Sequence, residues 1–265
     1  MTVGEMGRSA TQAPSRRVWS KVPEVTVLFW IIKILTTGMG ETTSDYLAKA
    51  IEPVLAVGIV GIVFAVALAV QFLVHRYVAA VYWFAIVMVS VFGTMVADVL
   101  HVALGVPYVV STVAFSVALA AIFIAWYVCE RTLSIHSIST RRRELFYWAT
   151  VLVTFALGTA AGDLTAVTLH LGYLASGVIF AVVIAVPAVA HRWLGMNAVL
   201  AFWFAYVTTR PLGASFADWL GVSHARGGLA LGTGPVSLTL AFVIICLVGY
   251  LAATRTDVQT GPNGR

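Results

Sequence analysis

A pattern of Trp, Gly and Asp recurs four times along this 265-residue chain with constant spacing. In each copy Gly follows Trp by ten positions and Asp follows it by fifteen. The copies are Trp30, Gly40, Asp45; Trp83, Gly93, Asp98; Trp148, Gly158, Asp163; and Trp203, Gly213, Asp218. Such a register predicts four structural repeats, each of which buries its apolar face only by packing against its neighbours.

The chain is too apolar for a water-soluble domain. It is 60% hydrophobic and 10% charged, with a mean hydropathy of +0.96, whereas soluble domains are about 25% charged. Apolar runs such as 54–74 and 109–128 reach the roughly 20 residues that span a bilayer. The runs and their breakers predict an all-α membrane protein with eight transmembrane helices, near residues 23–48, 54–75, 78–104, 108–129, 144–170, 173–192, 196–220 and 231–252.

Each predicted repeat consists of two helices. The predicted boundaries are an N-terminal tail 1–20, repeat 1 at 21–76, repeat 2 at 77–131, a loop 132–140, repeat 3 at 141–193, repeat 4 at 194–253 and a C-terminal tail 254–265. Because two helices separate successive motif Trp residues, the four motif helices run in the same direction. The repeats are therefore parallel, with a pseudo-symmetry axis along the membrane normal.

Basic residues are distributed unequally between the two ends of the predicted helices. If the N-terminus is cytoplasmic, only Lys49 and Arg226 lie outside. Twelve others lie inside: Arg8, Arg16, Arg17, Lys21, Arg76, Arg131, Arg141, Arg142, Arg143, Arg192, Arg255 and Arg265. The positive-inside rule then predicts that both termini and the loop 132–140 are cytoplasmic.

The motif helices carry one shared polar face. At about 100° per residue, positions four, seven, eleven, fifteen and eighteen after Trp lie on one side of a helix. In repeat order these are Ile34, Val87, Leu152, Val207; Thr37, Ser90, Phe155, Arg210; Glu41, Thr94, Thr159, Ala214; the four motif aspartates; and Ala48, His101, Ala166, Gly221. Charged groups avoid lipid, so four such faces predict a central polar region.

The motif aspartates admit two interpretations. In the functional one, Asp45, Asp98, Asp163 and Asp218 form a ring of carboxylates that binds or relays a cation. In the structural one, each Asp accepts hydrogen bonds from the next repeat while Gly40, Gly93, Gly158 and Gly213 allow close helix contact. Trp30, Trp83, Trp148 and Trp203 are assigned to an interfacial aromatic belt or to packing between repeats.

Residues that break the repeat pattern are stronger candidates for specificity. Glu41 with Asp45, and Asp98 with His101, share a helix face and could offer oxygen and nitrogen ligands to a divalent metal. Glu41 could instead accept hydrogen bonds from Thr or Ser on another helix. Lys33 and Arg210 lie inside predicted helices and are assigned charge-balancing or gating roles, with Pro211 freeing a carbonyl beside Arg210.

These residues resemble a family of bacterial membrane proteins known as tandem copies of a two-helix repeat of unknown function with a characteristic Trp. The resemblance covers residues 21–253, through the W-x9-G-x4-D pattern and the segments GDLTAVTLHLGYL and RPLGASFADWLG. It implies four repeats in the bacterial inner membrane and carries no activity.

The functional hypothesis therefore rests on the kinds of polar residue in these helices. Carboxylates, hydroxyls and His in a narrow stripe favour a transporter or exporter of a cation, a divalent metal rather than an organic substrate, with proton coupling as one option. The alternative is a membrane scaffold or sensor with structural aspartates. No enzyme motif is present in the sequence. The expected partners are lipid and a small inorganic cation, without nucleic acid; any bound cofactor would be that divalent metal, and the oligomeric state stays open.

Overall fold

The computed structural model describes residues 20–258, a range that is entirely helical and loop, without strands. The predicted tail 1–20 lies outside the described residues except for Ser20, and the tail 254–265 is described only as far as Val258. The long helices are α1 (Val27–Ala50), α2 (Pro53–Leu73), α3 (Ala79–Asp98), α4 (Tyr108–Glu130), α5 (Arg141–Asp163), α6 (Tyr173–Trp193), α7 (Ala198–Gly221) and α8 (Thr233–Thr254). All eight predicted helices are present, with ends shifted by a few residues.

Local sequence explains most helix starts. Thr26 accepts a hydrogen bond from the Phe29 N–H, and Thr140 caps α5 in the same way. Asn197 accepts from the first N–H groups of α7, whereas α2 begins with Pro53 after a capping Glu52. The inner-helix starts are therefore fixed by side chains, with the single exception of α3 among the four motif helices.

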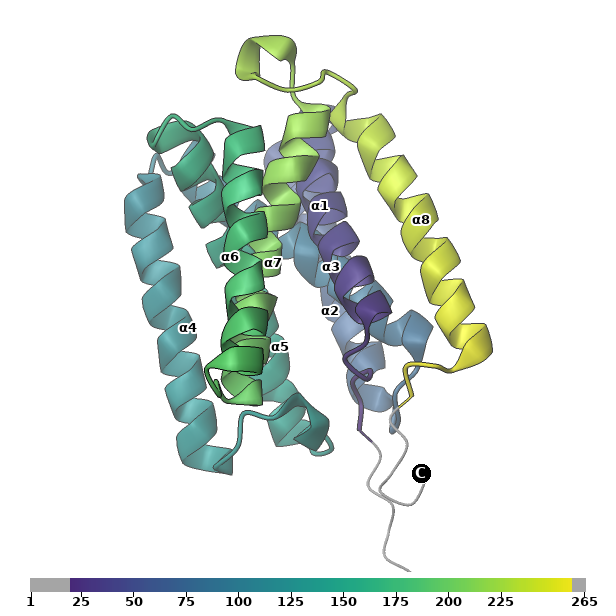
Figure 1. Ribbon diagram of the computed structural model, residues 1–265. Helices are drawn as coiled ribbons and strands as arrows, with labels where there is room; N and C mark the ends of the chain where they lie inside the picture. The colour runs from purple at the N-terminus through teal and green to yellow at the C-terminus, as the bar shows by residue number, and fades with distance from the viewer. Residues whose placement is uncertain (1–19, 259–265) are drawn as a thin grey trace, which may run out of the picture.

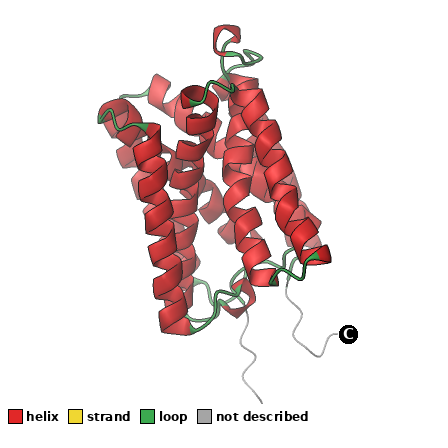
Figure 2. Cartoon of the chain, turned by 60° about the vertical axis from the view of Figure 1, so that its left-hand side comes forward, coloured by secondary structure: helices red, strands yellow, loops and turns green. Residues whose placement is uncertain are grey.

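The eight helices form an inner ring and an outer layer (Figure 1). The motif helices α1, α3, α5 and α7 contact one another in this order, and α7 closes the ring on α1. Each outer helix packs chiefly on the motif helix of the following repeat: α2 on α3, α4 on α5, α6 on α7 and α8 on α1. The repeats therefore interlock cyclically, and the loops gather at the two ends of the bundle (Figure 2).

The motif glycines form one closed layer of contacts around this ring. A Cβ atom added at Gly40 would lie closer than 3.0 Å to Ser90, and one added at Gly93 would meet Phe155 in the same way. The layer continues from Gly158 to Arg210 and returns from Gly213 to Thr37. In every case the neighbour is the residue seven after the motif Trp of the next repeat, so glycine is required where the inner helices approach most closely.

The motif tryptophans form a second closed layer, nearer the chain termini. The residue before each Trp contacts the Trp of the next repeat, with ring centroids 5.7 to 6.2 Å apart. The pairs are Phe29–Trp83, Tyr82–Trp148, Tyr147–Trp203 and Phe202–Trp30. Trp83, Trp148 and Trp203 are buried, so these side chains pack between repeats and do not form an exposed belt.

Six helical segments are long and apolar enough to cross a membrane, consistent with a multi-pass membrane protein. They are Pro53–Leu73, Ala79–Ala103, Tyr108–Glu130, Arg141–Thr168, Tyr173–Trp193 and Thr233–Thr254. α1 and α7, which we predicted as spans, fall short because they carry Lys33, Glu41, Arg210 and other polar residues. Both lie in the inner ring, where neighbouring helices pack against their polar residues.

Candidate functional site in the inner ring

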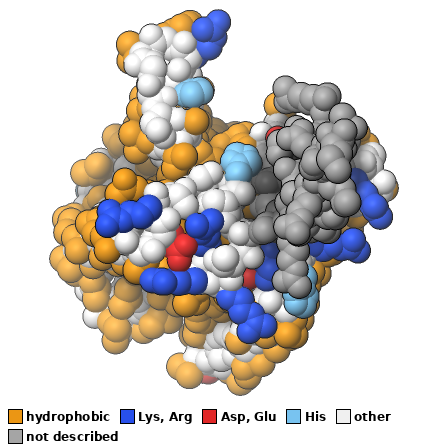
Figure 3. Space-filling view, turned by 90° about the horizontal axis from the view of Figure 1, so that it is seen from below, with side chains coloured by type: hydrophobic (Ala, Val, Ile, Leu, Met, Phe, Trp, Pro, Cys, Tyr) orange, Lys and Arg blue, Asp and Glu red, His pale blue; other side chains and the backbone are white. Residues whose placement is uncertain are grey.

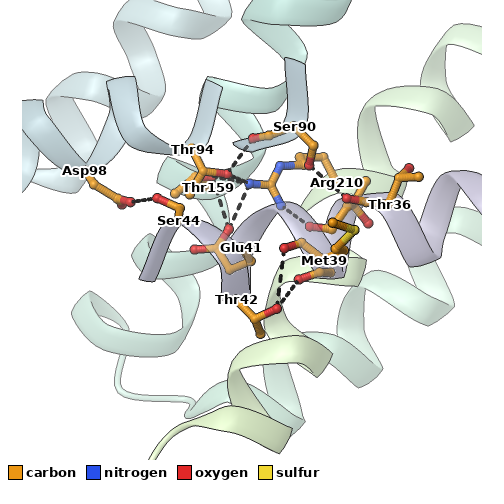
Figure 4. A network of polar contacts seen from close by, with 12 residues as sticks. Thr36, Met39, Glu41, Thr42, Ser44, Ser90, Thr94, Asp98, Thr159 and Arg210 are labelled. Carbon is orange, nitrogen blue, oxygen red and sulfur yellow. Dashed lines mark hydrogen bonds and ion pairs between the residues drawn. The ribbon is translucent and has the colours of Figure 1, made fainter. Parts of the chain in front are cut away.

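A buried ion pair joins the first and last repeats at the centre of the ring (Figure 4). The Arg210 guanidinium of α7 donates to Glu41 Oε2 of α1 at 2.8 Å, and both side chains are almost fully buried. Arg210 also donates to the Thr37 carbonyl at 2.9 Å, to Thr159 Oγ1 at 2.7 Å and to Thr94 Oγ1. One side chain thus links all four motif helices. The acidic partner of Arg210 is Glu41, whereas the predicted charge-balancing role assigned it an aspartate.

Lys33 lies one layer nearer the termini and meets aromatic faces. Its Nζ lies 4.0 Å from the centroid of the Phe155 ring and 4.3 Å from that of Tyr206. The side chain is fully buried, and Nζ has neither a hydrogen bond nor an acidic partner among the described residues. The structure therefore does not bring Lys33 to a motif aspartate. The Arg210 guanidinium also approaches the Phe155 ring, with its Cζ 5.2 Å from the ring centroid.

The motif aspartates occupy the opposite end of the ring, beyond Glu41. Ser44 donates to Asp98 Oδ2 at 2.9 Å across repeats 1 and 2, and Lys49 pairs with Asp45 at 3.2 Å at an exposed edge. Asp163 and Asp218 receive no side-chain hydrogen bond or ion pair from the described residues. Asp218 lies within electrostatic range of Glu41 and of the other three aspartates. The shared face predicted for these residues therefore concentrates five carboxyl groups.

Two of the four aspartates are followed by an irregular helical segment that sequence periodicity did not reveal. α3 changes to a π-helix over Val99–Ala103 directly after Asp98, and α5 does so over Leu164–Thr168 after Asp163. α1 and α7 continue as α-helix past their aspartates. Single π turns occur frequently at functional sites because they turn side chains away from the regular helical face.

The four residues predicted as metal ligands are not assembled into a metal site. His101 uses both ring nitrogens locally, toward the Val106 carbonyl at 3.0 Å and Ser111 Oγ at 3.3 Å. Glu41 is held by Arg210, while Asp45 and Asp98 have the separate partners described above. Within residues 20–258, no three His, Cys, Asp or Glu side chains are grouped closely enough to hold a metal ion.

Two buried polar contacts near the termini were missed by the sequence analysis. The hydroxyl groups of Tyr82 and Tyr147 share a hydrogen bond inside the aromatic layer. In the sequence, both residues directly precede a motif Trp, and this shared position could have indicated the contact. Glu144 binds Lys21 Nζ at 2.6 Å and Gln71 Nε2 at 3.1 Å, although all three are far apart in sequence. These contacts fasten the end of the ring that lies away from the aspartates.

The fold and the repeated residues define a class of all-helical protein built from four cyclically interlocked repeats, with six helices that are consistent with a multi-pass membrane protein. The family model described as Repeat of Unknown Function (DUF347) matches residues 28–77, 81–132, 146–196 and 201–257. The chain belongs to this family, as the resemblance in the sequence implied. No curated protein and no solved structure matches the chain.

Proposed function

We propose that this protein transports a small cation, with a divalent metal as the preferred substrate, through the interior of the inner ring. The observation that carries the proposal is the gathering of Glu41 and four aspartates at one end of the ring. Among the described residues, only Glu41 has a buried cationic partner there. Lys49 pairs with Asp45 at the exposed edge. Arg226 lies within electrostatic range of the other aspartates Asp163 and Asp218. Five carboxyl groups therefore outnumber three basic side chains at this end. Because concentrated carboxylates repel one another and attract cations, a mobile divalent ion would neutralise a charge that the protein leaves uncompensated.

Glu41 is suited to link the acidic end to the buried centre. It is held by Arg210 on one side and lies within electrostatic range of Asp98, Asp163 and Asp218 on the other. A cation arriving at the aspartates would compete with Arg210 for the Glu41 carboxylate. Proton exchange at the same carboxyl groups would allow coupling of cation movement to a proton gradient.

Lys33 and Arg210 would act as the barrier on the far side of Glu41. Both basic side chains are buried and approach the Phe155 ring, and the aromatic layer closes the ring of helices beyond them. A cation could pass only after this positive layer moved away from the axis. We therefore expect alternation between an arrangement open toward the aspartates and one open toward the termini.

The proposed setting is the bacterial inner membrane, with eight spans and both termini in the cytoplasm. α1 and α7 would cross the bilayer inside the ring, shielded by the six more apolar spans. Near helix ends on the side of the termini lie the exposed residues Arg76, Arg131, Arg141, Arg142, Arg192 and Arg255. Figure 3, which views the molecule from below, shows Lys and Arg side chains on this end. This asymmetry supports the cytoplasmic assignment for that face.

A non-transporting scaffold or sensor is the second candidate. The 2.9 Å bond between Ser44 and Asp98 joins neighbouring repeats, as a structural aspartate would. In that case replacing an aspartate by Asn would lower thermal stability equally with and without ions. In the transport case, the ion-dependent part of the stability would change.

Thermal unfolding of the purified protein, titrated separately with Mg²⁺, Mn²⁺, Co²⁺, Ni²⁺ and Zn²⁺, tests the proposal. We expect one or more ions to raise the unfolding temperature in a saturable manner. Asp163→Asn and Asp218→Asn should remove that rise, because these two carboxyl groups have no side-chain partner in the described structure.

Glu24→Gln provides the control, since Glu24 is an exposed carboxyl group that precedes α1 and lies outside the repeat register. Its ion-dependent rise should equal that of the wild type. The proposal is contradicted if no ion stabilises the protein, or if the rise survives all four substitutions at Asp45, Asp98, Asp163 and Asp218.

A further inference from the structure

A cavity with a partly polar wall lies at the end of the molecule that carries the termini, away from the acidic end of the ring. It has a volume of about 430 Å³ and lies between the link from α2 to α3 and the end of α8. Its polar wall includes Arg76, Arg255 and Asp257, and its apolar wall includes Leu251 and Ala252. The volume and mixed lining suit a small amphipathic molecule.

Asp257, which lines this cavity, carries an unsatisfied acceptor. The residue is only 2% exposed, and Tyr77 donates its hydroxyl proton to Asp257 Oδ2. The other oxygen, Oδ1, is buried without a hydrogen-bond partner among the described residues. Burial raises the pKa of the Asp257 carboxyl, and the hydrogen bond from Tyr77 opposes that rise. A cationic N–H donor on Oδ1 would satisfy the acceptor and stabilise its charge.

The same cavity offers donors for an anion. Arg76 and Arg255 are exposed and form no ion pair with the described residues. The wall also contains the start of α3, whose cap residue Val78 has no side-chain acceptor for the first N–H groups. Two guanidinium groups beside an uncapped helix N-terminus match the chemistry of a phosphate.

The position of the cavity along the helices indicates the source of such a ligand. α2 ends at Leu73, α3 begins at Ala79 and α8 ends at Thr254, and all three belong to the six segments long enough to span a membrane. The cavity therefore lies at the depth where lipid headgroups meet the hydrocarbon region. Ile245 is an exposed apolar residue of α8 that precedes Ala252 by seven positions, so it lies on the same helix face as this cavity residue.

We propose that this cavity binds the headgroup of a phosphatidylethanolamine-type lipid. The lipid phosphate contacts Arg76 and Arg255, the primary ammonium donates to Asp257 Oδ1, and an acyl chain follows the apolar side of α8. The requirement for an N–H donor separates this lipid from one with a quaternary ammonium, and the requirement for a cation separates it from a purely anionic lipid. The inference is independent of cation transport.

The test compares three lipids with identical acyl chains, carrying ethanolamine, choline or glycerol headgroups, added to delipidated protein in detergent. We expect the ethanolamine lipid to raise the unfolding temperature by roughly 3 °C more than either of the others. Asp257→Asn should abolish this difference, and the double variant Arg76→Gln, Arg255→Gln should reduce stabilisation by all phospholipids.

Two controls separate lipid recognition from structural damage. Tyr77→Phe removes the hydrogen bond to Oδ2 but leaves the carboxylate, so the ethanolamine preference should persist. Arg192→Gln removes a basic residue of the same face that does not line the cavity, and should also leave the preference unchanged. Native mass spectrometry of the wild type, which does not depend on the folding of any variant, should detect one ethanolamine lipid retained after washing.

The proposal is overturned if the wild type does not distinguish the ethanolamine lipid from the other two, or retains none of it in the mass spectrometer. It is also overturned if Asp257→Asn folds and keeps the ethanolamine preference. The cation titrations described above involve other residues, so failure of one proposal leaves the other testable.

Discussion

The inner and outer helices of each repeat differ in what they bury. In the spans that contain α3 and α5, 61% and 67% of the most apolar 18-residue stretch is buried inside the structure. The corresponding values for the outer helices α2, α4, α6 and α8 lie between 17% and 28%. The inner helices carry the motif residues and the buried ion pair, and the outer helices present apolar side chains to the surroundings. The repeat thus combines one helix that builds the interior with one that presents exposed apolar side chains at the surface of the bundle.

The largest effect should come from breaking the buried ion pair of the inner ring. Arg210→Met leaves Glu41 buried without its cation and should reduce the free energy of unfolding by about 3–5 kcal/mol. Chemical unfolding in detergent measures this change. The double variant Glu41→Gln, Arg210→Met should recover part of the loss, because the uncompensated charge is then gone.

The exposed ion pair of the same inner helix is the control for that experiment. Lys49→Met breaks the pair with Asp45, in which the Lys49 side chain is 61% exposed, and should cost at most about 1 kcal/mol. Equal losses for Arg210→Met and Lys49→Met would contradict the description of a buried polar centre.

The glycine layer should give the next largest effect. Gly213→Ala forces a Cβ atom against Thr37 and the Ile34 carbonyl and should cost about 1–3 kcal/mol of unfolding free energy. Gly249→Ala in outer helix α8 is the matched control, because nothing lies within 4 Å of the added atom. If both substitutions had the same effect in thermal unfolding, the closed ring of inner helices would be wrong.

The hydrogen bond inside the aromatic layer should contribute less. Tyr82→Phe leaves the Tyr147 hydroxyl without this partner and should cost about 1 kcal/mol. The double variant with Tyr147→Phe should cost less than twice that amount, since both polar groups are removed together. Strict additivity of the two substitutions would show that the hydroxyl groups do not interact.

The smallest effect is expected on the outer surface. Ile62 of α2 is 68% exposed, so Ile62→Ala should change the unfolding free energy in detergent by less than about 0.5 kcal/mol. A loss above about 1 kcal/mol would mean that α2 packs against a further surface, and sedimentation of the purified protein would identify a second copy of the chain.

Much of this architecture could be predicted because the repeat pattern and helical periodicity act together. The shared face anticipated that Thr37, Ser90, Phe155 and Arg210 would point inward, and each proves to contact the motif Gly of the preceding repeat. Apolar runs and breakers located the helices. They did not distinguish α1 and α7 from the six helices that are apolar enough to cross a membrane.

The partners inside the ring could not be predicted in the same way. Arg210 pairs with Glu41 and not with one of the four aspartates, and Lys33 contacts aromatic rings. Both contacts depend on which residues of α1 and α7 lie side by side when α7 closes the ring on α1. His101 lies in a π-helical turn and satisfies both ring nitrogens nearby. These contacts depend on how far neighbouring helices are shifted along their axes relative to one another. The residue pattern of one helix does not define that shift.

The central claim, that the acidic end of the inner ring handles a transported cation, is tested most directly by ion flux. Wild-type protein and the Asp218→Asn variant would be reconstituted in liposomes containing a metal-sensitive dye, with Glu24→Gln as control. We predict that at least one divalent ion crosses at a saturable rate with the wild type and with Glu24→Gln. With Asp218→Asn the rate should be lower by a factor of about ten or more. Equal rates for Asp218→Asn and the wild type, or no protein-dependent flux of any ion, would contradict the claim.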